Sequence, residues 1–103
     1  MQVLFKTEKD TLTVFLSGDI DHHTSKKIRE VIDGEMQRLM PSQLRLDFRD
    51  VHFMDSSGVG LVMGRYKTAL IYGCRVFVSH MPSSVEKIMR MSGLGSIITF
   101  EKE

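Results

Sequence analysis

The hydrophobic residues of the chain fall into short β-prone runs separated by longer stretches with helical spacing. The runs Val3–Phe5 and Leu12–Leu16 lie on either side of a polar turn candidate at 8–10. Two such runs joined by a short polar turn predict an antiparallel hairpin. Gly18 is expected to end the second strand of this hairpin.

Three stretches place apolar residues at helical spacing, so that each expected helix has an apolar face. The first runs from Thr24, its expected N-cap, to about Met40, and the third covers 82–90. The expected core face of the first consists of Ile28, Val31, Ile32, Met36, Leu39 and Met40. The second runs from about Ser57 to Tyr72. Its expected core face consists of Val59, Leu61, Val62, Met63, Tyr66, Ala69, Leu70 and Ile71.

Three further apolar runs are expected to form strands, at 44–48, 74–79 and 97–100. The elements therefore follow the order β-β-α-β-α-β-α-β. Strands joined by helical crossovers are parallel, whereas the N-terminal hairpin is antiparallel. We therefore expect an α/β fold with a mixed sheet of four to five strands and three to four helices, in a single domain over residues 1–103.

Composition is that of an ordinary globular protein, with 42% hydrophobic and 26% charged residues. A net charge of +1 argues against a general electrostatic footprint for nucleic acid, so no direct nucleic-acid partner is expected. No apolar stretch approaches the length of a membrane span, and no N-terminal segment suggests export. The single cysteine, Cys74, fits a reducing cytoplasm and is expected to be a buried structural thiol.

The joint between the expected strand at 44–48 and the helix from about Ser57 carries the most informative chemistry. Asp55, Ser56 and Ser57 all offer a side-chain oxygen that can cap the helix. A helix N-terminus also favours negative charge, so a phosphate is tolerated there. Three glycines follow and permit close packing on the sheet or close approach of a partner. They are Gly58, Gly60 and Gly64.

Three segments carry a resemblance to a known family. They are FMDSSGVGLVMGRYK at 53–67, SGDIDHHT at 17–24 and MSGL at 91–94. In sequence, order and spacing they resemble the anti-sigma factor antagonists of the STAS-domain family, and among these the sporulation type. The match extends over nearly the whole chain. The resemblance implies the STAS fold, which agrees with the expected order of elements.

The resemblance also implies a function and a site. Ser56 corresponds to the serine that is phosphorylated in the family, and Asp21 to a loop aspartate of the partner-binding surface. Ser57 is then the N-cap candidate. The expected partner surface comprises Asp21, Asp55, Ser56, Ser57 and Gly58.

The partner implied by the resemblance is an anti-sigma factor that is also an ATP-dependent serine kinase. The unphosphorylated domain binds it and releases the sigma factor, phosphorylation of Ser56 switches binding off, and a serine phosphatase resets the switch. The domain is expected to be a cytoplasmic monomer, a kinase substrate rather than an enzyme, and to need no cofactor. The loop at 18–24 and the joint both follow strands and precede helices, so both are expected at one edge of the sheet.

Other chemistries fit these residues less well. The glycines at 58 and 60 follow a strand, but GxxxxGK[ST] is absent and Gly64 lies one residue beyond the third glycine of GxGxxG. Nucleotide hydrolysis is therefore disfavoured, whereas weak nucleotide binding and a constitutive binding module remain alternatives. Ser56 lacks the GxSxG setting of a catalytic nucleophile, although the fold can bring His22 or His23 near it.

A metal site is also disfavoured. Asp19, Asp21, His22 and His23 offer suitable ligand atoms, but no HExxH or CxxC pattern accompanies them. We expect a solvated or partner-facing loop there, with no bound metal.

Overall fold

The computed structural model of the chain describes residues 2–101, so Met1 and residues 102–103 of the expected domain lie outside the described residues. These residues form one five-stranded sheet in the order β1-β2-β3-β4-β5. β1 is antiparallel to β2, and all other neighbouring strands are parallel. The elements are β1 (Gln2–Glu8), β2 (Thr11–Ile20), α1 (His22–Leu39), β3 (Gln43–Met54), α2 (Ser56–Tyr72), β4 (Arg75–Ser79), α3 (Ser83–Met91), the 3₁₀-helix η1 (Leu94–Ser96) and β5 (Thr99–Glu101). The predicted α/β class with a mixed sheet is confirmed.

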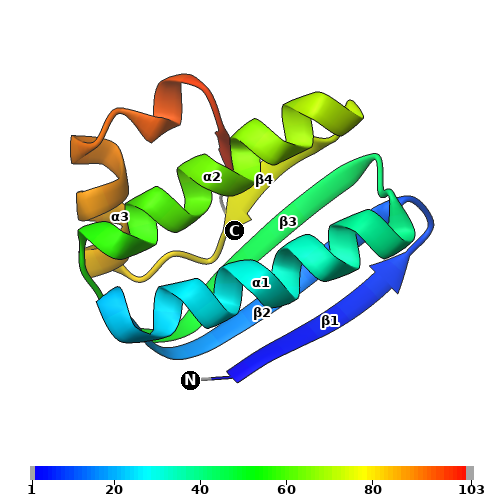
Figure 1. The fold of residues 1–103 in the computed structure, drawn as a ribbon. Coiled ribbons are helices and arrows are strands. Elements are labelled where there is room, and N and C mark those ends of the chain that lie inside the picture. The colour runs from blue at the N-terminus through cyan, green and yellow to red at the C-terminus, as the bar shows by residue number, and fades with distance from the viewer. Residues whose placement is uncertain (1, 102–103) are drawn as a thin grey trace.

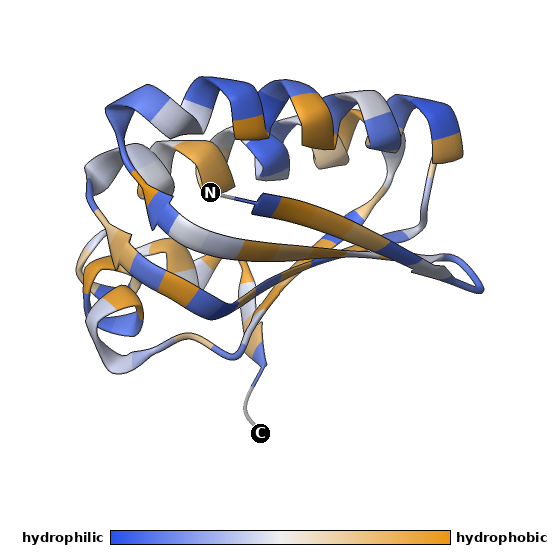
Figure 2. Cartoon of the chain, turned by 90° about the horizontal axis from the view of Figure 1, so that it is seen from below, coloured by the Kyte–Doolittle hydropathy of each residue, from blue (hydrophilic) through white to orange (hydrophobic). Residues whose placement is uncertain are grey.

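The helices α1 and α2 lie next to each other across one face of the sheet (Figures 1 and 2). α1 packs on β2 and α2 on β4, while α3 packs against β3 near the start of α2. None of the helices in the described part of the chain is long and apolar enough to cross a membrane.

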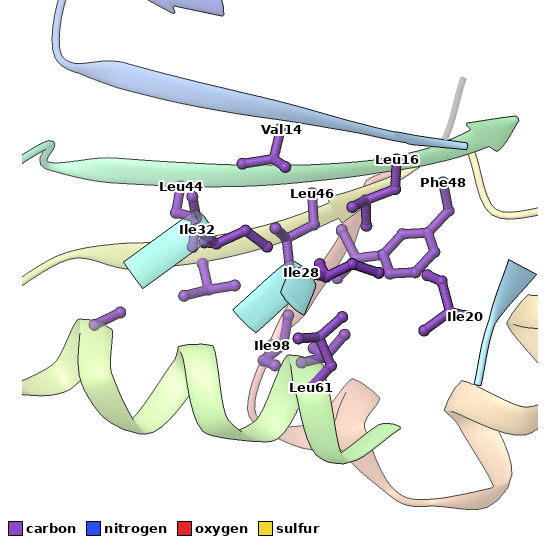
Figure 3. Packing of buried hydrophobic residues seen from close by; sticks show 14 of the residues in the cluster. Val14, Leu16, Ile20, Ile28, Ile32, Leu44, Leu46, Phe48, Leu61 and Ile98 are labelled. Carbon is purple, nitrogen blue, oxygen red and sulfur yellow. The ribbon is translucent and has the colours of Figure 1, made fainter. Parts of the chain in front are cut away.

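The core forms between this face of the sheet and the helices, because alternate residues of each central strand point toward them. In β2 the side chains of Val14 and Leu16 are buried, and in β3 those of Leu46 and Phe48. Figure 3 shows these side chains meeting Ile28 and Ile32 of α1 and Leu61 of α2. Ile28, Ile32 and Met36 of the first helix are buried as predicted. Met40, expected on the same face, is 57% exposed and lies at the C-cap of α1.

Both central strands are longer than the sequence predicts. β2 continues through Gly18 to Ile20, and β3 runs through 50–52, where a connection was expected. Gly18 has a φ of 88° and sits between two shifts in the β2–β3 register. A glycine at such an irregularity bends the strand without ending it. Val51 is buried, which keeps 50–52 attached to the core.

The buried face of α2 also differs from the prediction. Leu61, Val62 and Ala69 are buried as expected, but Leu70 is 60% and Ile71 is 81% exposed. The face includes Arg65 instead, which is only 4% exposed. A search for apolar residues misses such a position because a charged residue is seldom fully buried unless it is paired.

Arg65 is paired with Asp33 of α1, with 2.8 Å between Arg65 Nε and Asp33 Oδ1. Burial lowers the pKa of the Arg65 guanidinium, the Asp33 carboxylate opposes this shift, and the nearby charge of Arg29 adds to it. Arginine nevertheless keeps its charge in proteins. This ion pair therefore links α1 to α2.

Cys74 directly precedes β4 and is buried, as predicted. Burial raises the pKa of its thiol. A thiol in this setting stays protonated and is a poor nucleophile.

Replacing Asp33 is expected to lower the free energy of unfolding more than replacing Arg65. Asp33→Ala leaves a buried guanidinium without its carboxylate, and we expect it to lower the free energy of unfolding by about 2–3 kcal/mol. Arg65→Met keeps an apolar stem, and the Asp33 side chain, which is 30% exposed, remains hydrated. We expect that change to cost less than about 1.5 kcal/mol. Urea unfolding followed by circular dichroism measures both values, and an Arg65→Met cost equal to or above that of Asp33→Ala contradicts this account.

Candidate functional site

The candidate site lies where β2 and β3 end at the same edge of the sheet. The two strands are parallel and pair in a register that places Ile20 opposite Met54. The amide of Asp55 donates a hydrogen bond to the carbonyl oxygen of Ile20 over 3.2 Å. α1 and α2 begin immediately after these strands, and Figure 1 shows their N-termini at one end of the molecule. The structure thus brings together the two segments that the sequence predicted to be neighbours.

Asp21, not Thr24, is the N-cap of α1. One carboxylate oxygen of Asp21 accepts hydrogen bonds from the amides of His23 and Thr24, at 2.9 and 3.0 Å. The amide of Asp21 donates to Oγ1 of Thr24 over 3.0 Å, which completes a reciprocal capping box. Thr24 Oγ1 in turn donates to the carbonyl oxygen of Asp19. Asp21 is therefore held rigidly at the edge by the start of its own helix.

Asp55 plays the corresponding part in α2. Its carboxylate accepts a hydrogen bond from the amide of Ser57 over 2.8 Å, and its backbone is extended. The expectation that Ser57 caps this helix is therefore wrong, because Ser57 is the second helical residue and Asp55 occupies the capping position. Ser56 is the first helical residue and is exposed. Its hydroxyl has no part in the cap.

The three glycines at the joint differ in what they do. A Cβ atom on Gly58 would collide with the side chain of Met54, so the close packing expected here is real. A Cβ on Gly60 or Gly64 would meet nothing within 4 Å. The fold therefore requires close approach at Gly58 but leaves open space above the other two glycines.

The electrostatics of the edge follow from its capping bonds. The hydrogen bond from the Thr24 amide is the main cause that lowers the pKa of Asp21, partly opposed by burial, with further lowering from the His23 amide. His22 and His23 place their ring centroids 5.8 Å apart, edge to face, and both are exposed. Within residues 2–101, no three side chains of His, Cys, Asp or Glu gather as a group that could hold a metal ion.

A groove of about 530 Å³ opens beside Ser57, between the first turns of α1 and α2. Sequence reasoning missed this groove because its walls come from two helices that are far apart in the chain. Neither Ser56 nor Ser57 is hydrogen-bonded to a histidine in the described part of the chain, although His22 and His23 line the groove with Ser57. The lining residues are His22, His23, Ser25, Lys26, Arg29, Ser57, Gly60 and Leu61.

Comparison with known proteins identifies the family. The family model described as the STAS domain matches residues 2–103. The chain belongs to the STAS-domain family. Among curated relatives, this STAS domain is 36% identical over 98 residues to the anti-sigma F factor antagonist of Paenibacillus polymyxa, covering 95% of this chain and 84% of that protein.

Two solved structures of SpoIIAA extend this comparison to three dimensions. The unphosphorylated form of the anti-sigma factor antagonist SpoIIAA matches with a TM-score of 0.84 at 29% identity, over 99% of this chain and 90% of that one. The phosphorylated form of the Bacillus cell fate determinant SpoIIAA matches with a TM-score of 0.75 at 28% identity, over 99% and 93%. The predicted resemblance and the predicted STAS fold are thus confirmed.

Substitution by alanine is expected to have opposite effects at different glycines of α2. Gly58→Ala is expected to lower the free energy of unfolding by about 1–2 kcal/mol, because its Cβ displaces Met54 by more than the gain in helix propensity restores. Gly60→Ala and Gly64→Ala meet no obstruction and are expected to stabilise the domain by up to about 1 kcal/mol. Thermal and urea unfolding of the three variants test this order. A stabilising Gly58→Ala would show that Met54 moves aside without cost.

The cap of α1 predicts an acid-sensitive helix start. The hydrogen bond from the Thr24 amide, above all, holds the pKa of Asp21 below its ordinary value. Its stabilising effect is therefore fully present above that value and is lost as the pH falls through the lower native pKa. Asp21→Ser keeps a capping oxygen but cannot titrate. We expect hydrogen exchange at the His23 and Thr24 amides to accelerate relative to Asp21→Ser as the pH falls from about 5 to 2. Equal acid loss in both proteins would assign the effect to other groups.

Proposed function

We propose that this STAS domain is an anti-sigma factor antagonist whose unphosphorylated form binds an anti-sigma factor that is also an ATP-dependent serine kinase. Binding releases the sigma factor, and phosphorylation of Ser56 ends the interaction. The observation that carries this proposal is the exposed Ser56 hydroxyl at the start of α2, which is free of the capping role that Asp55 fills. The names of the curated relative and of the SpoIIAA structures support the same activity.

The partner surface in this proposal comprises Asp21, Asp55, Ser56, Ser57 and Gly58. Asp21 and Asp55 hold the two loop backbones through their caps, and Gly58 lets α2 approach Met54. Ser56 presents the hydroxyl that accepts the phosphate. The surface is therefore rigid before the partner arrives, which limits the entropy lost on binding.

The switch acts at this surface rather than on the fold. A phosphate adds a charge of about −1.5 to −2 at pH 7. It stands beside Asp55 and across the sheet edge from Asp21, where like charge and desolvation oppose a docked partner. The N-terminus of α2 favours the negative charge, so the helix itself is not destabilised. The good match to the phosphorylated form of SpoIIAA supports a switch that preserves the fold.

The remaining parts of the proposal follow from the same cycle. A serine phosphatase regenerates the binding form, and the domain is a substrate rather than an enzyme. It acts as a cytoplasmic monomer formed by residues 1–103, with no cofactor. Similarity to an anti-sigma F factor antagonist supports a role in the control of a sporulation sigma factor.

Substitutions at the two adjacent serines separate the switch from the fold. With the anti-sigma factor kinase of the same organism and ATP, the unaltered domain and Ser57→Ala are each expected to gain one phosphate, on Ser56. Ser56→Ala gains none and keeps binding, whereas Ser56→Asp weakens binding by at least about tenfold, or 1.4 kcal/mol. Tryptic mass spectrometry and calorimetric titration measure these outcomes, and circular dichroism controls for folding.

The reverse pattern of labelling would overturn the site assignment. If Ser57→Ala abolished phosphate incorporation while Ser56→Ala did not, the switch would lie on Ser57. Binding that is equal in the phosphorylated and unphosphorylated forms would leave a constitutive binding module.

A further inference from the structure

The groove beside Ser57 has a regular construction from two helix faces. Its α1 wall includes residues 22, 25, 26 and 29, which follow the i, i+3, i+4, i+7 spacing of one helical face. Its α2 wall includes residues 57, 60 and 61, which follow the same spacing. One turn further along both helices, Arg65 and Asp33 join the two faces by their ion pair. Ser57 of the proposed partner surface therefore lines the groove, and the ion pair joins the two helices one turn beyond Arg29 and Leu61.

The charge of the groove is of one sign. Lys26 and Arg29 line it, and no carboxylate does. In the described part of the chain, neither of these two cations forms an ion pair, and both are exposed. Asp33, the carboxylate one turn beyond Arg29, is already engaged by Arg65. Glu30 is exposed on α1 but is not among the lining residues.

The shape of the groove favours an extended occupant over a single ion. The basic and imidazole side chains are spread along α1 from 22 to 29, a distance of about 10 Å at the rise of an α-helix. Lys26 and Arg29 lie one helical turn apart and can both reach one anion. An extended acidic peptide can contact these two cations and, at the same time, the imidazoles of His22 and His23 further along α1. Opposite them, Gly60 has no side chain and nothing lies within 4 Å of where its Cβ would be. Leu61 adds an apolar contact beside this space.

We propose that the groove receives an acidic segment of the anti-sigma factor, whose carboxylates pair with Lys26 and Arg29. This inference rests on the proposed function, because it names the chemistry of the same partner. The groove begins at Ser57, one residue from the phosphate acceptor, so an occupant of the groove also positions the partner over Ser56. Charges at such an exposed surface mainly raise the rate of association and set its dependence on salt.

The experiment compares two charge-reversed variants that alter the net charge equally. Lys26→Glu with Arg29→Glu changes the groove, and Lys67→Glu with Lys87→Glu changes two exposed lysines of α2 and α3 that do not line it. Binding to the anti-sigma factor kinase is measured with ADP, which cannot donate a phosphate. We expect the groove variant to bind at least about tenfold more weakly and to lose most of the salt dependence, and the control to remain within about twofold of the unaltered domain.

A second measurement examines the groove without the kinase. The ¹⁵N-labelled domain is titrated with hexaglutamate at low ionic strength, where screening is weak. Amide shifts are expected at 22–29 and 57–61, and they should vanish in the groove variant. Gly60→Leu fills the space above α2 without a charge change and should also suppress them, while its improved helix propensity preserves the fold.

Each outcome has a definite meaning. A kinase that binds the unaltered domain and the groove variant equally overturns the proposal. ATP that shifts these amides where hexaglutamate does not would make the groove a nucleotide site and also overturns it. If the kinase binds no form of the domain, the proposed function fails. In that case, amide shifts at the groove with hexaglutamate still support an acidic ligand there. Their absence overturns the acidic ligand as well.

Discussion

The parallel pairing of β2 with β3 is the constraint on which the rest of the site depends. Its register places Ile20 opposite Met54. The hydrogen bond from the Asp55 amide to the Ile20 carbonyl then joins the residue that follows β3 to the last residue of β2. A slip of one residue would turn the alternating core side chains of β3 toward solvent. The packing that buries Leu46 and Phe48 therefore also determines where Ser56 stands.

This placement explains why carboxylates cap the two helices and the Ser56 hydroxyl does not. Each helix begins directly after its strand, and the first amides of a helix need acceptors. Asp21 and Asp55 supply them at equivalent positions. Because aspartates fill both caps, the fold makes no demand on the Ser56 hydroxyl. A residue that the fold does not use can be modified without loss of stability, which is what a switch confined to an interface requires.

The sequence predicted the order of elements, the mixed sheet, most core positions of α1 and the proximity of the two loops, because these depend on periodicity and on crossover topology. It misplaced the ends of β2 and β3, since a glycine with positive φ can either end a strand or, as Gly18 does, sit inside an irregular one. It also misassigned both helix caps. Asp, Ser and Thr have similar capping preferences, and only the backbone after each strand decides which one is used.

Two further features escaped prediction because they join residues of α1 with residues of α2. Arg65 interrupts an apolar face, and its burial makes sense only once Asp33 is known to lie beside it. The groove likewise combines residues from one face of each helix, and neither face is unusual alone. Periodicity within one helix therefore identifies what packs on the sheet, but not what two helices form between them.

The charges around Ser56 suggest how the proposed switch would act on an acidic partner. Asp21 and Asp55 are engaged in caps, so their charges are partly satisfied by backbone amides. Lys26 and Arg29 are unpaired within the described residues and carry two positive charges near Ser57. A phosphate of about −1.5 to −2 charges on Ser56 nearly cancels them. In the proposed switch, phosphorylation therefore acts less by repelling the partner from the aspartates than by removing the attraction that an acidic segment has for the groove. The same cations that draw the kinase to its substrate would become the counterions of its product.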